Sequence, residues 1–164
     1  MIRSKLLFFL VMIFFQTRAQ VESGTYNAML KTILSHSVPE VSIKKLKVMN
    51  DVTLLDAREP AEFGVSHIAN AISIGYDQFN VSTVKNLDKN TKIVVYCSVG
   101  YRSEKIAEKL KKEGFTHVSN LYGGIFEWVN QGNPVIDSNG QPTKRVHGYS
   151  KSWAIWLNKG EKVY

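Results

Sequence analysis

Cysteine is almost absent from this chain, because its 164 residues include only Cys97. A single cysteine cannot form an internal disulfide, so the fold must be held together by packing. The histidines His36, His117 and His147 stand far apart, and none has the spacing of a metal-ligand pair. The sequence therefore excludes a disulfide scaffold and gives no sign of a metal site. An unpaired thiol of this kind is either a small buried side chain or a reactive group.

The chain also lacks an apolar run long enough to span a bilayer, which takes about 20 residues. The apolar run Leu6–Phe15 has ten residues. It follows Arg3 and Lys5 and is succeeded by a small residue at Ala19, a pattern typical of a secretory signal peptide. We expect residues 1–19 to be removed after Ala19, which predicts an exported protein, periplasmic or secreted, with no stable membrane insertion. An uncleaved anchor is the alternative.

Acidic residues are in the minority, with 14 Asp and Glu against 21 Lys and Arg. Removal of the signal peptide, which carries three basic residues and no acidic one, lowers the net charge from +7 to +4. The remaining lysines are scattered among glutamates, as around residues 109–112, which is typical of a solvated helix face. We therefore expect no nucleic-acid partner. A mildly positive surface suits small anionic substrates.

The 145 residues after the signal peptide are enough for one domain with a full core and hardly enough for two. We divide them into a helical lead-in at 20–37, a main domain at 38–134 and a C-terminal extension at 135–164. In the extension, Trp153 and Trp156 recur at helical spacing and predict a short amphipathic helix. We expect this helix to pack its tryptophans on the domain. A stripe that binds a partner is the alternative.

Strand-like and helix-like patterns alternate through the main domain. Short apolar runs at 52–55, 92–96 and 117–121 are typical of buried strands. A helix around 106–110 separates the last two and is closed by Gly114. Buried strands linked by helices predict an α/β fold with a central, mainly parallel sheet and helices on both faces. Two further helices are expected upstream, at 26–34 and 44–49.

Cys97 directly follows the strongest predicted strand and lies one short loop before the helix. Ligands of open α/β sheets bind beyond the carboxyl ends of the strands. A loop in this place can turn its backbone N–H groups inward to bind an anion, and Gly100 permits the positive φ that such a turn needs. These N–H groups and Arg102 favour the thiolate form of the cysteine. The combination suits attack on an anionic sulfur or phosphorus compound.

Four segments, in the same order, resemble motifs of the rhodanese-like domain family. The first is the loop itself, which has four residues between Cys97 and Arg102 and is followed by Ser103 and a helix. The resemblance covers roughly residues 38–134. The other three segments are similar to the family's Asp-x-Arg with Glu-Phe at 54–63, its Gly-His-Ile-x-Gly-Ala at 66–71 and its Gly-Gly-x-x-x-Trp at 123–128.

Two residues depart from the family pattern, since Ser66 and Asn70 stand where it has glycines. Asn tolerates the left-handed backbone that glycine adopts, so Asn70 is a mild change. Ser66 lies away from the cysteine loop, and we expect neither residue to abolish activity. Between them, we interpret His67 as a structural histidine hydrogen-bonded within its own turn, because a thiolate needs no general base.

The resemblance implies a sulfurtransferase that works in two steps through a persulfide on Cys97. The thiolate takes the outer sulfur of a small anionic donor, such as thiosulfate or a persulfide, and a thiol or cyanide accepts it. Arg102 would anchor the donor, and no metal or organic cofactor is needed. Asp56 and Arg58 are expected to form a buried ion pair that fixes the strand end. The loop residues expected to surround the substrate are Ser98, Val99, Gly100, Tyr101 and Ser103.

Two other functions remain open. Phosphatases and arsenate reductases also use a cysteine–arginine loop, but they place five residues between the two, and arsenate reduction by a thiol relay needs further cysteines. A non-catalytic binding module or sulfur carrier is the stronger alternative. Loss of the cysteine usually marks such a module, and this chain retains Cys97 together with Arg102. The sequence gives no indication of the oligomeric state.

Overall fold

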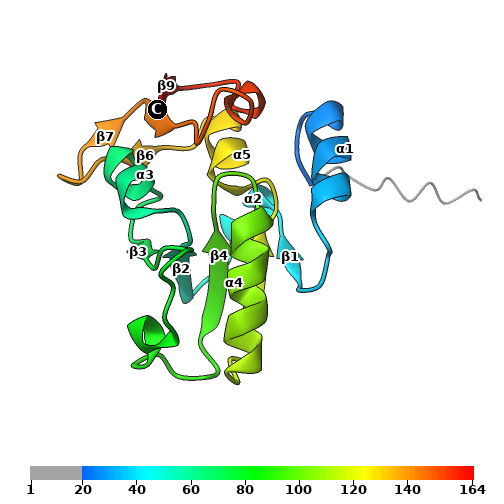
Figure 1. Cartoon of the computed structure of the whole chain (residues 1–164), viewed down its shortest axis with the longest axis vertical. Coiled ribbons are helices and arrows are strands. Elements are labelled where there is room, and N and C mark those ends of the chain that lie inside the picture. The colour runs from blue at the N-terminus through cyan, green and yellow to red at the C-terminus, as the bar shows by residue number, and fades with distance from the viewer. Residues whose placement is uncertain (1–19) are drawn as a thin grey trace, which may run out of the picture.

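The computed structural model describes residues 20–164, and the expected signal peptide at 1–19 lies outside the described residues. Figure 1 shows a central sheet flanked by helices, with the C-terminal extension at one end. Within residues 20–164, no helix is long and apolar enough to cross a membrane. The elements are, in chain order, α1 (Gly24–Ile33), β1 (Glu40–Val41), α2 (Ile43–Leu46), β2 (Val52–Asp56), α3 (Pro60–Val65), β3 (Ile72–Ser73), η1 (Val81–Val84), β4 (Lys92–Tyr96), α4 (Tyr101–Lys112), β5 (Val118–Leu121), α5 (Gly124–Asn130), β6 (Val135–Ile136), β7 (Pro142–Thr143), β8 (Arg145–His147), η2 (Ala154–Trp156) and β9 (Glu161–Val163).

The central sheet has five strands in the order β1-β5-β4-β2-β3, and every neighbouring pair in it is parallel. This confirms the predicted fold class; the three predicted strands are β2, β4 and β5, and the upstream helices are α1 and α2. The register pairs Asp56 with Tyr96 and Val95 with Asn120. The carboxyl ends of β2, β4 and β5 therefore meet at one edge of the sheet, where Cys97 follows Tyr96.

Strand β4 separates two hydrophobic cores, because successive side chains of a strand point to opposite faces. Val94 and Tyr96 belong to one core, together with residues of α1, α2, α5 and the C-terminal extension. Ile93 and Val95 belong to the other, together with residues of α4. Each fully buried aliphatic side chain contributes about 1.5–3 kcal/mol. Helices thus cover both faces, as predicted, and the two cores fix the strand that leads into Cys97.

A short helix that the sequence analysis did not predict, α3, brings Glu62 to the cysteine loop. It begins at Pro60, whose fixed φ and missing N–H suit the first turn of a helix. Glu59 and Glu62 form a capping box, in which each side chain accepts a hydrogen bond from the backbone of the other. The helix has only six residues, which is too short to show a helical period in the sequence.

The prediction of a short amphipathic helix in the C-terminal extension is wrong. The segment forms a three-residue 3₁₀ helix, η2, and then strand β9, which pairs with β8. Asn130 of α5 explains the difference, because its amide donates to the carbonyl of Trp156 at 2.9 Å and its oxygen accepts the N–H of Asn158 at 2.7 Å. These bonds satisfy backbone groups that a continuing helix would use. Trp156 nevertheless stacks on Tyr26, with ring centroids 5.5 Å apart, so the extension packs against α1.

Candidate active site

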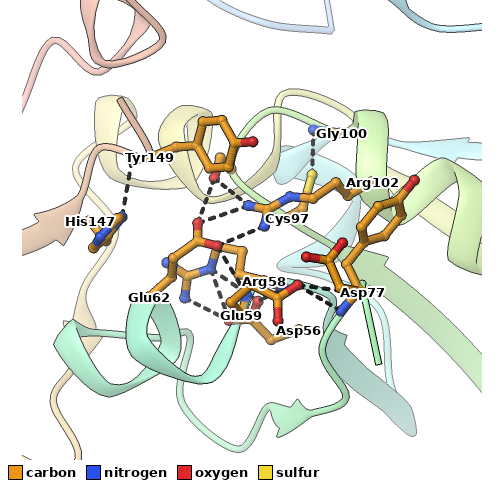
Figure 2. A network of polar contacts seen from close by, with 12 residues as sticks. Asp56, Arg58, Glu59, Glu62, Asp77, Cys97, Gly100, Arg102, His147 and Tyr149 are labelled. Carbon is orange, nitrogen blue, oxygen red and sulfur yellow. Dashed lines mark hydrogen bonds and ion pairs between the residues drawn. The ribbon is translucent and has the colours of Figure 1, made fainter. Parts of the chain in front are cut away.

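Cys97 lines a pocket of about 310 Å³ at the carboxyl end of β4. The backbone N–H of Gly100 donates a hydrogen bond to the Sγ atom of Cys97 at 3.1 Å (Figure 2). Gly100 is the N-cap of α4 and has a φ of 124°, so the positive φ expected there is confirmed. An N–H group aimed at the sulfur stabilises negative charge on it. Negative charge that forms on this sulfur during a reaction would therefore meet the Gly100 N–H.

The first turn of α5 holds the carbonyl side of the cysteine loop. The N–H groups of Ile125 and Phe126 donate to the carbonyl oxygens of Cys97 and Ser98 at 2.9 and 3.1 Å. Gly124 makes this approach possible, because a Cβ there would overlap the Cys97 oxygen, and its φ is 55°. Since α5 binds both carbonyl oxygens, they are engaged away from the sulfur. An anion at Sγ therefore meets the Gly100 N–H rather than these two carbonyl dipoles.

Behind the loop, Ser103 and Asn120 form a fully buried polar pair. The Ser103 hydroxyl donates to Asn120 Oδ1 at 2.7 Å, and Asn120 Nδ2 donates to the carbonyl of Gly100 at 3.0 Å. Ser103, predicted to surround the substrate, lies outside the pocket lining and holds the Gly100 backbone in place. The sequence analysis gave Asn120 no role, because nothing in its local sequence shows that β5 ends beside the loop.

Arg102 forms an ion pair with Glu62 at the pocket (Figure 2). Its Nη1 and Nη2 groups donate to the two carboxylate oxygens at 2.7 and 2.8 Å, so the pair is bidentate. Nη2 also donates to the hydroxyl of Ser98 at 3.1 Å. Three of the five guanidinium N–H groups are therefore used by Glu62 and Ser98. The sequence analysis gave Glu62 no role, and its only signal was the Glu-Phe pair in the family motif.

The ion pair determines the charge of both side chains. Burial alone raises the pKa of Glu62, but the hydrogen bonds and charge of Arg102 outweigh it and hold that pKa below its ordinary value of 4.5. Burial alone lowers the pKa of Arg102, whereas hydrogen bonding to Glu62 and the negative charges of the Cys97 thiolate and of Glu62 raise it above its ordinary value. Both side chains are charged at neutral pH, and their charges offset each other locally.

Apolar and aromatic side chains make up most of the pocket wall. The Tyr149 ring lies under the Arg102 guanidinium, whose Cζ is 4.9 Å from the ring centroid. The sequence analysis predicted the lining from the loop and α4 but missed the contributions of α1 and of the C-terminal extension. The aromatic spacing in the extension was the only available signal for them. The lining residues are Ile33, Cys97, Ser98, Val99, Tyr101, Arg102, Tyr149 and Trp153.

The expected ion pair between Asp56 and Arg58 is confirmed. Both side chains are fully buried, and Arg58 Nη2 lies 2.6 Å from Asp56 Oδ2. The same nitrogen donates to the carbonyl of Ser66 at 2.7 Å. Although burial lowers the pKa of Arg58, the charge of Asp56 raises it above its ordinary value, so the arginine stays charged. Neither residue lines the pocket; the pair joins the end of β2 to the turn at Ser66.

His67, in the turn after α3, is hydrogen-bonded within that turn, as expected. His67 Nδ1 lies 3.1 Å from the carbonyl oxygen of Phe63, and the two rings stack with centroids 3.8 Å apart. Asn70 has a φ of 64°, the left-handed backbone that asparagine tolerates. Ser66 has a φ of −169°, which is extended backbone that any residue adopts. The two departures from the family's glycines are therefore accommodated without strain.

The side chains at the pocket support nucleophilic chemistry by sulfur. Cys97 supplies the nucleophile, Gly100 supplies an N–H for its charge, and Arg102 supplies a cation that is paired with Glu62. Within residues 20–164, no group of three or more His, Cys, Asp or Glu side chains is placed to hold a metal ion.

The site and the fold together define an α/β protein with a cysteine in the loop between a parallel strand, β4, and the helix that follows it, α4. Comparison with known families extends this result, because residues 42–131 match the model of the rhodanese-like domain. The chain belongs to the rhodanese-like domain family. The matched range includes the cysteine loop, α3 and α5, but it excludes α1 and the C-terminal extension.

The chain is also similar to individual proteins and to solved structures. The chain is 31% identical over 97 residues to a sulfurtransferase of Allochromatium vinosum, a match that covers 59% of this chain and 90% of the relative. It is 42% identical over 83 residues to a tRNA uridine(34) hydroxylase of Aster yellows witches'-broom phytoplasma, covering 48% of this chain and 27% of that relative. It therefore spans only about a quarter of the hydroxylase. The crystal structure of the BH2092 protein from Bacillus halodurans is similar, with a TM-score of 0.55, 28% identity and coverage of 71% of this chain and 86% of that one.

Proposed function

We propose that this protein is a sulfurtransferase that carries sulfur as a persulfide on Cys97. The observation that supports this most strongly is the Gly100 N–H group 3.1 Å from Sγ, in a loop whose Cys97 and Ser98 carbonyls are bound by α5. A persulfide on Sγ extends one sulfur atom further into the pocket and carries negative charge on that atom. The loop is suited to stabilise this charge.

The proposed reaction has two half-reactions. In the first, the Cys97 thiolate attacks the outer sulfur of the donor, a new bond forms between Sγ and that sulfur, and the bond inside the donor breaks. The donor leaves with the electron pair, as sulfite from thiosulfate or as a thiolate from an organic persulfide. In the second, a thiol or cyanide attacks the outer sulfur of the persulfide, and Cys97 leaves as the thiolate. No net oxidation or reduction of the protein occurs over the cycle.

Arg102 and the residues beside it have supporting roles in this proposal. Arg102 is within the pocket lining and stays charged in its ion pair with Glu62, so it positions the loop and offers N–H groups to the donor without adding a net positive charge. Ser98 holds one of its N–H groups in place. Tyr101, which is 46% exposed, lies at the mouth of the pocket. Asp56 and Arg58 lie outside the pocket and contribute by joining the end of β2 to the turn at Ser66.

The proposal is tested by the initial rate of sulfur transfer to cyanide, with persulfide or thiosulfate as the donor. We expect parallel double-reciprocal plots, which are the kinetic sign of two half-reactions. We expect Cys97→Ser to abolish turnover while the variant remains folded by circular dichroism. Turnover that persists in Cys97→Ser would contradict the proposal. A folded wild-type protein that binds donors without any transfer would identify a non-catalytic binding module instead.

We also propose that residues 1–19 direct export and are cleaved after Ala19. Support comes from the ten-residue apolar run at Leu6–Phe15, preceded by Arg3 and Lys5. N-terminal sequencing of the protein recovered from an extracytoplasmic fraction is expected to begin at Gln20. Full-length protein retained in the membrane would instead support an uncleaved anchor.

A further inference from the structure

The pocket around Cys97 is walled on one side by segments outside the matched family range. Ile33 comes from the end of α1, and Tyr149 and Trp153 come from the C-terminal extension. Figure 1 shows α1 and the extension together at the end of the sheet where β4 leads into α4. The three side chains add an aliphatic and two aromatic surfaces to a pocket that the loop alone would leave open. Their chemistry indicates what the pocket accepts.

We infer that the preferred sulfur donor is an organic persulfide with an uncharged, apolar body, rather than thiosulfate. This inference rests on the proposed sulfurtransfer at Cys97 and narrows its donor. Three features support this inference: the apolar wall of the pocket, the ion pair in which Glu62 offsets the charge of Arg102, and the size of the pocket.

The charge of the pocket disfavours a dianion. Among residues 20–164, Arg102 is the only charged side chain that lines the pocket, and Glu62 binds it through two hydrogen bonds of 2.7 and 2.8 Å. The pair has no net charge, and the Cys97 thiolate adds a negative one. Thiosulfate, which carries two negative charges, would approach this set without an uncompensated cation. An apolar persulfide brings less charge and meets less repulsion.

The apolar wall is held rigidly enough to select a ligand. The Glu104 carboxylate accepts the N–H groups of Ser35 at 3.0 Å and Ser37 at 3.2 Å, which fixes the chain just after Ile33 to α4. The stacking of Trp156 on Tyr26 joins the extension to α1. A wall that is ordered before binding loses little conformational entropy when a ligand arrives.

The pocket volume is also larger than an inorganic donor requires. Its volume of about 310 Å³ lies at the lower end of the range in which proteins bind organic small molecules, roughly 300–1,000 Å³. An aromatic or aliphatic group beside the sulfur would fill the space between Ile33, Tyr149 and Trp153 and displace water from apolar surface. Thiosulfate would leave that surface wet.

The proposed step balances in atoms and charge. The Cys97 thiolate attacks the outer sulfur of the persulfide R–S–SH, the bond between Sγ and that sulfur forms, and the S–S bond of the donor breaks. During the transfer the proton stays with the transferred sulfur, giving Cys97–S–SH, and the electron pair of the broken bond leaves with the thiolate R–S⁻. The persulfide afterwards loses this proton to solvent, which gives the anionic form that the Gly100 N–H stabilises. One negative charge is present before and after the step. The walls formed by Ile33 and Trp153 would contact the leaving group R.

The experiment compares the rate at which Cys97 gains a sulfur atom from three donors, by intact mass under single-turnover conditions. The donors are benzyl persulfide, glutathione persulfide and thiosulfate. We expect benzyl persulfide to react at least about tenfold faster than either charged donor, which is the scale of discrimination given by a well-fitted apolar contact. An equal or faster reaction with thiosulfate or glutathione persulfide would overturn this inference and leave the proposed function intact. No sulfur gained from any donor would overturn both.

Single substitutions distinguish an effect of the pocket wall on donor preference from a general effect on folding. Trp153→Ala is expected to lower the ratio of the rate with benzyl persulfide to the rate with thiosulfate about tenfold. Ile33→Ala is expected to lower the same ratio. Ile33→Ala supplies the test if Trp153→Ala does not fold. The matched control is Ile155→Ala, because Ile155 lies in the same extension, is 61% exposed and does not line the pocket. An unchanged preference in both wall variants, or an equal loss in the control, would contradict the assignment of the wall.

Discussion

Gly124 lies against the carbonyl oxygen of Cys97 so closely that a Cβ at this position would overlap it. The contact allows the N–H groups of Ile125 and Phe126 to bind the Cys97 and Ser98 carbonyls. The conformation of the cysteine loop therefore depends on a helix that begins 27 residues later in the chain. The packing of α5 against the loop therefore helps to set the position of the reactive sulfur.

We predict that Gly124→Ala reduces sulfur transfer about 100-fold, since displacing a reacting group by about 1 Å can cost that much. The added methyl group must push the loop away from α5, and the glycine's φ of 55° adds backbone strain. Overpacking of this kind also lowers the free energy of unfolding by about 1–3 kcal/mol. Stopped-flow rates and urea denaturation measure the two effects.

Gly64→Ala is the control for this substitution. Gly64 lies in α3, and a Cβ there would meet no atom within 4 Å. We expect full activity and a free energy of unfolding that is unchanged or raised by up to about 1 kcal/mol, because alanine favours helix. A loss of activity as large as that of Gly124→Ala would show that the contact with the cysteine loop is not the cause.

Glu62→Gln is expected to destabilise the protein at neutral pH. The pKa of Glu62 is held below its ordinary value by Arg102, so the ionised carboxylate stabilises the folded state above about pH 4.5, the pKa of an ordinary glutamate. That contribution is lost as the pH falls through the depressed pKa. The melting temperature of the variant should therefore lie below that of the wild type at pH 7 and approach it in acid. A difference that does not change with pH would contradict the ion pair's contribution.

Glu127→Gln is expected to stabilise the protein at neutral pH, the opposite of the effect expected for Glu62→Gln. Burial raises the pKa of Glu127 above its ordinary value, against hydrogen bonds from Gln131 and the Glu22 backbone that lower it. Ionisation of a group whose folded pKa is raised costs stability at higher pH, and the cost disappears once the folded and unfolded states are both protonated. The variant should melt above the wild type at pH 7, and the two should converge below about pH 4.5. A lower melting temperature at pH 7 would contradict this account.

Asp56→Asn is expected to lower the free energy of unfolding by about 3–5 kcal/mol, because it leaves Arg58 charged, fully buried and unpaired. Urea denaturation at pH 7 measures the loss. The double variant Asp56→Asn with Arg58→Met removes the buried charge and should be less destabilised than Asp56→Asn alone. A double variant that is less stable than either single one would show that the pair does not act as a unit.

The sequence predicts the parts of this molecule that depend on short-range patterns. The buried run of β4 shows the strand that leads to Cys97, and Gly100 shows where a positive φ is needed. The same local signals place Asp56 and Arg58 two residues apart at the end of a strand. These features could be predicted because each depends on neighbours in the chain.

The remaining parts of the site depend on contacts between distant segments. Glu62 reaches Arg102 from a helix 40 residues away, and Asn120 reaches Gly100 from the next strand. Tyr149 and Trp153 reach the pocket from the C-terminal extension, which the Trp156–Tyr26 stacking joins to α1 and Asn130 joins to α5. No local pattern in the sequence carries that information, which explains why a short amphipathic helix was predicted around Trp153 and Trp156 in place of the 3₁₀ turn and strand β9.

The most direct test of sulfur transfer at Cys97 is the intact mass of the protein after reaction with a persulfide. We predict a gain of one sulfur atom, its loss on addition of cyanide or a thiol, and no gain in Cys97→Ser. A wild-type protein that stays folded and gains no sulfur from benzyl persulfide, glutathione persulfide or thiosulfate would contradict the account.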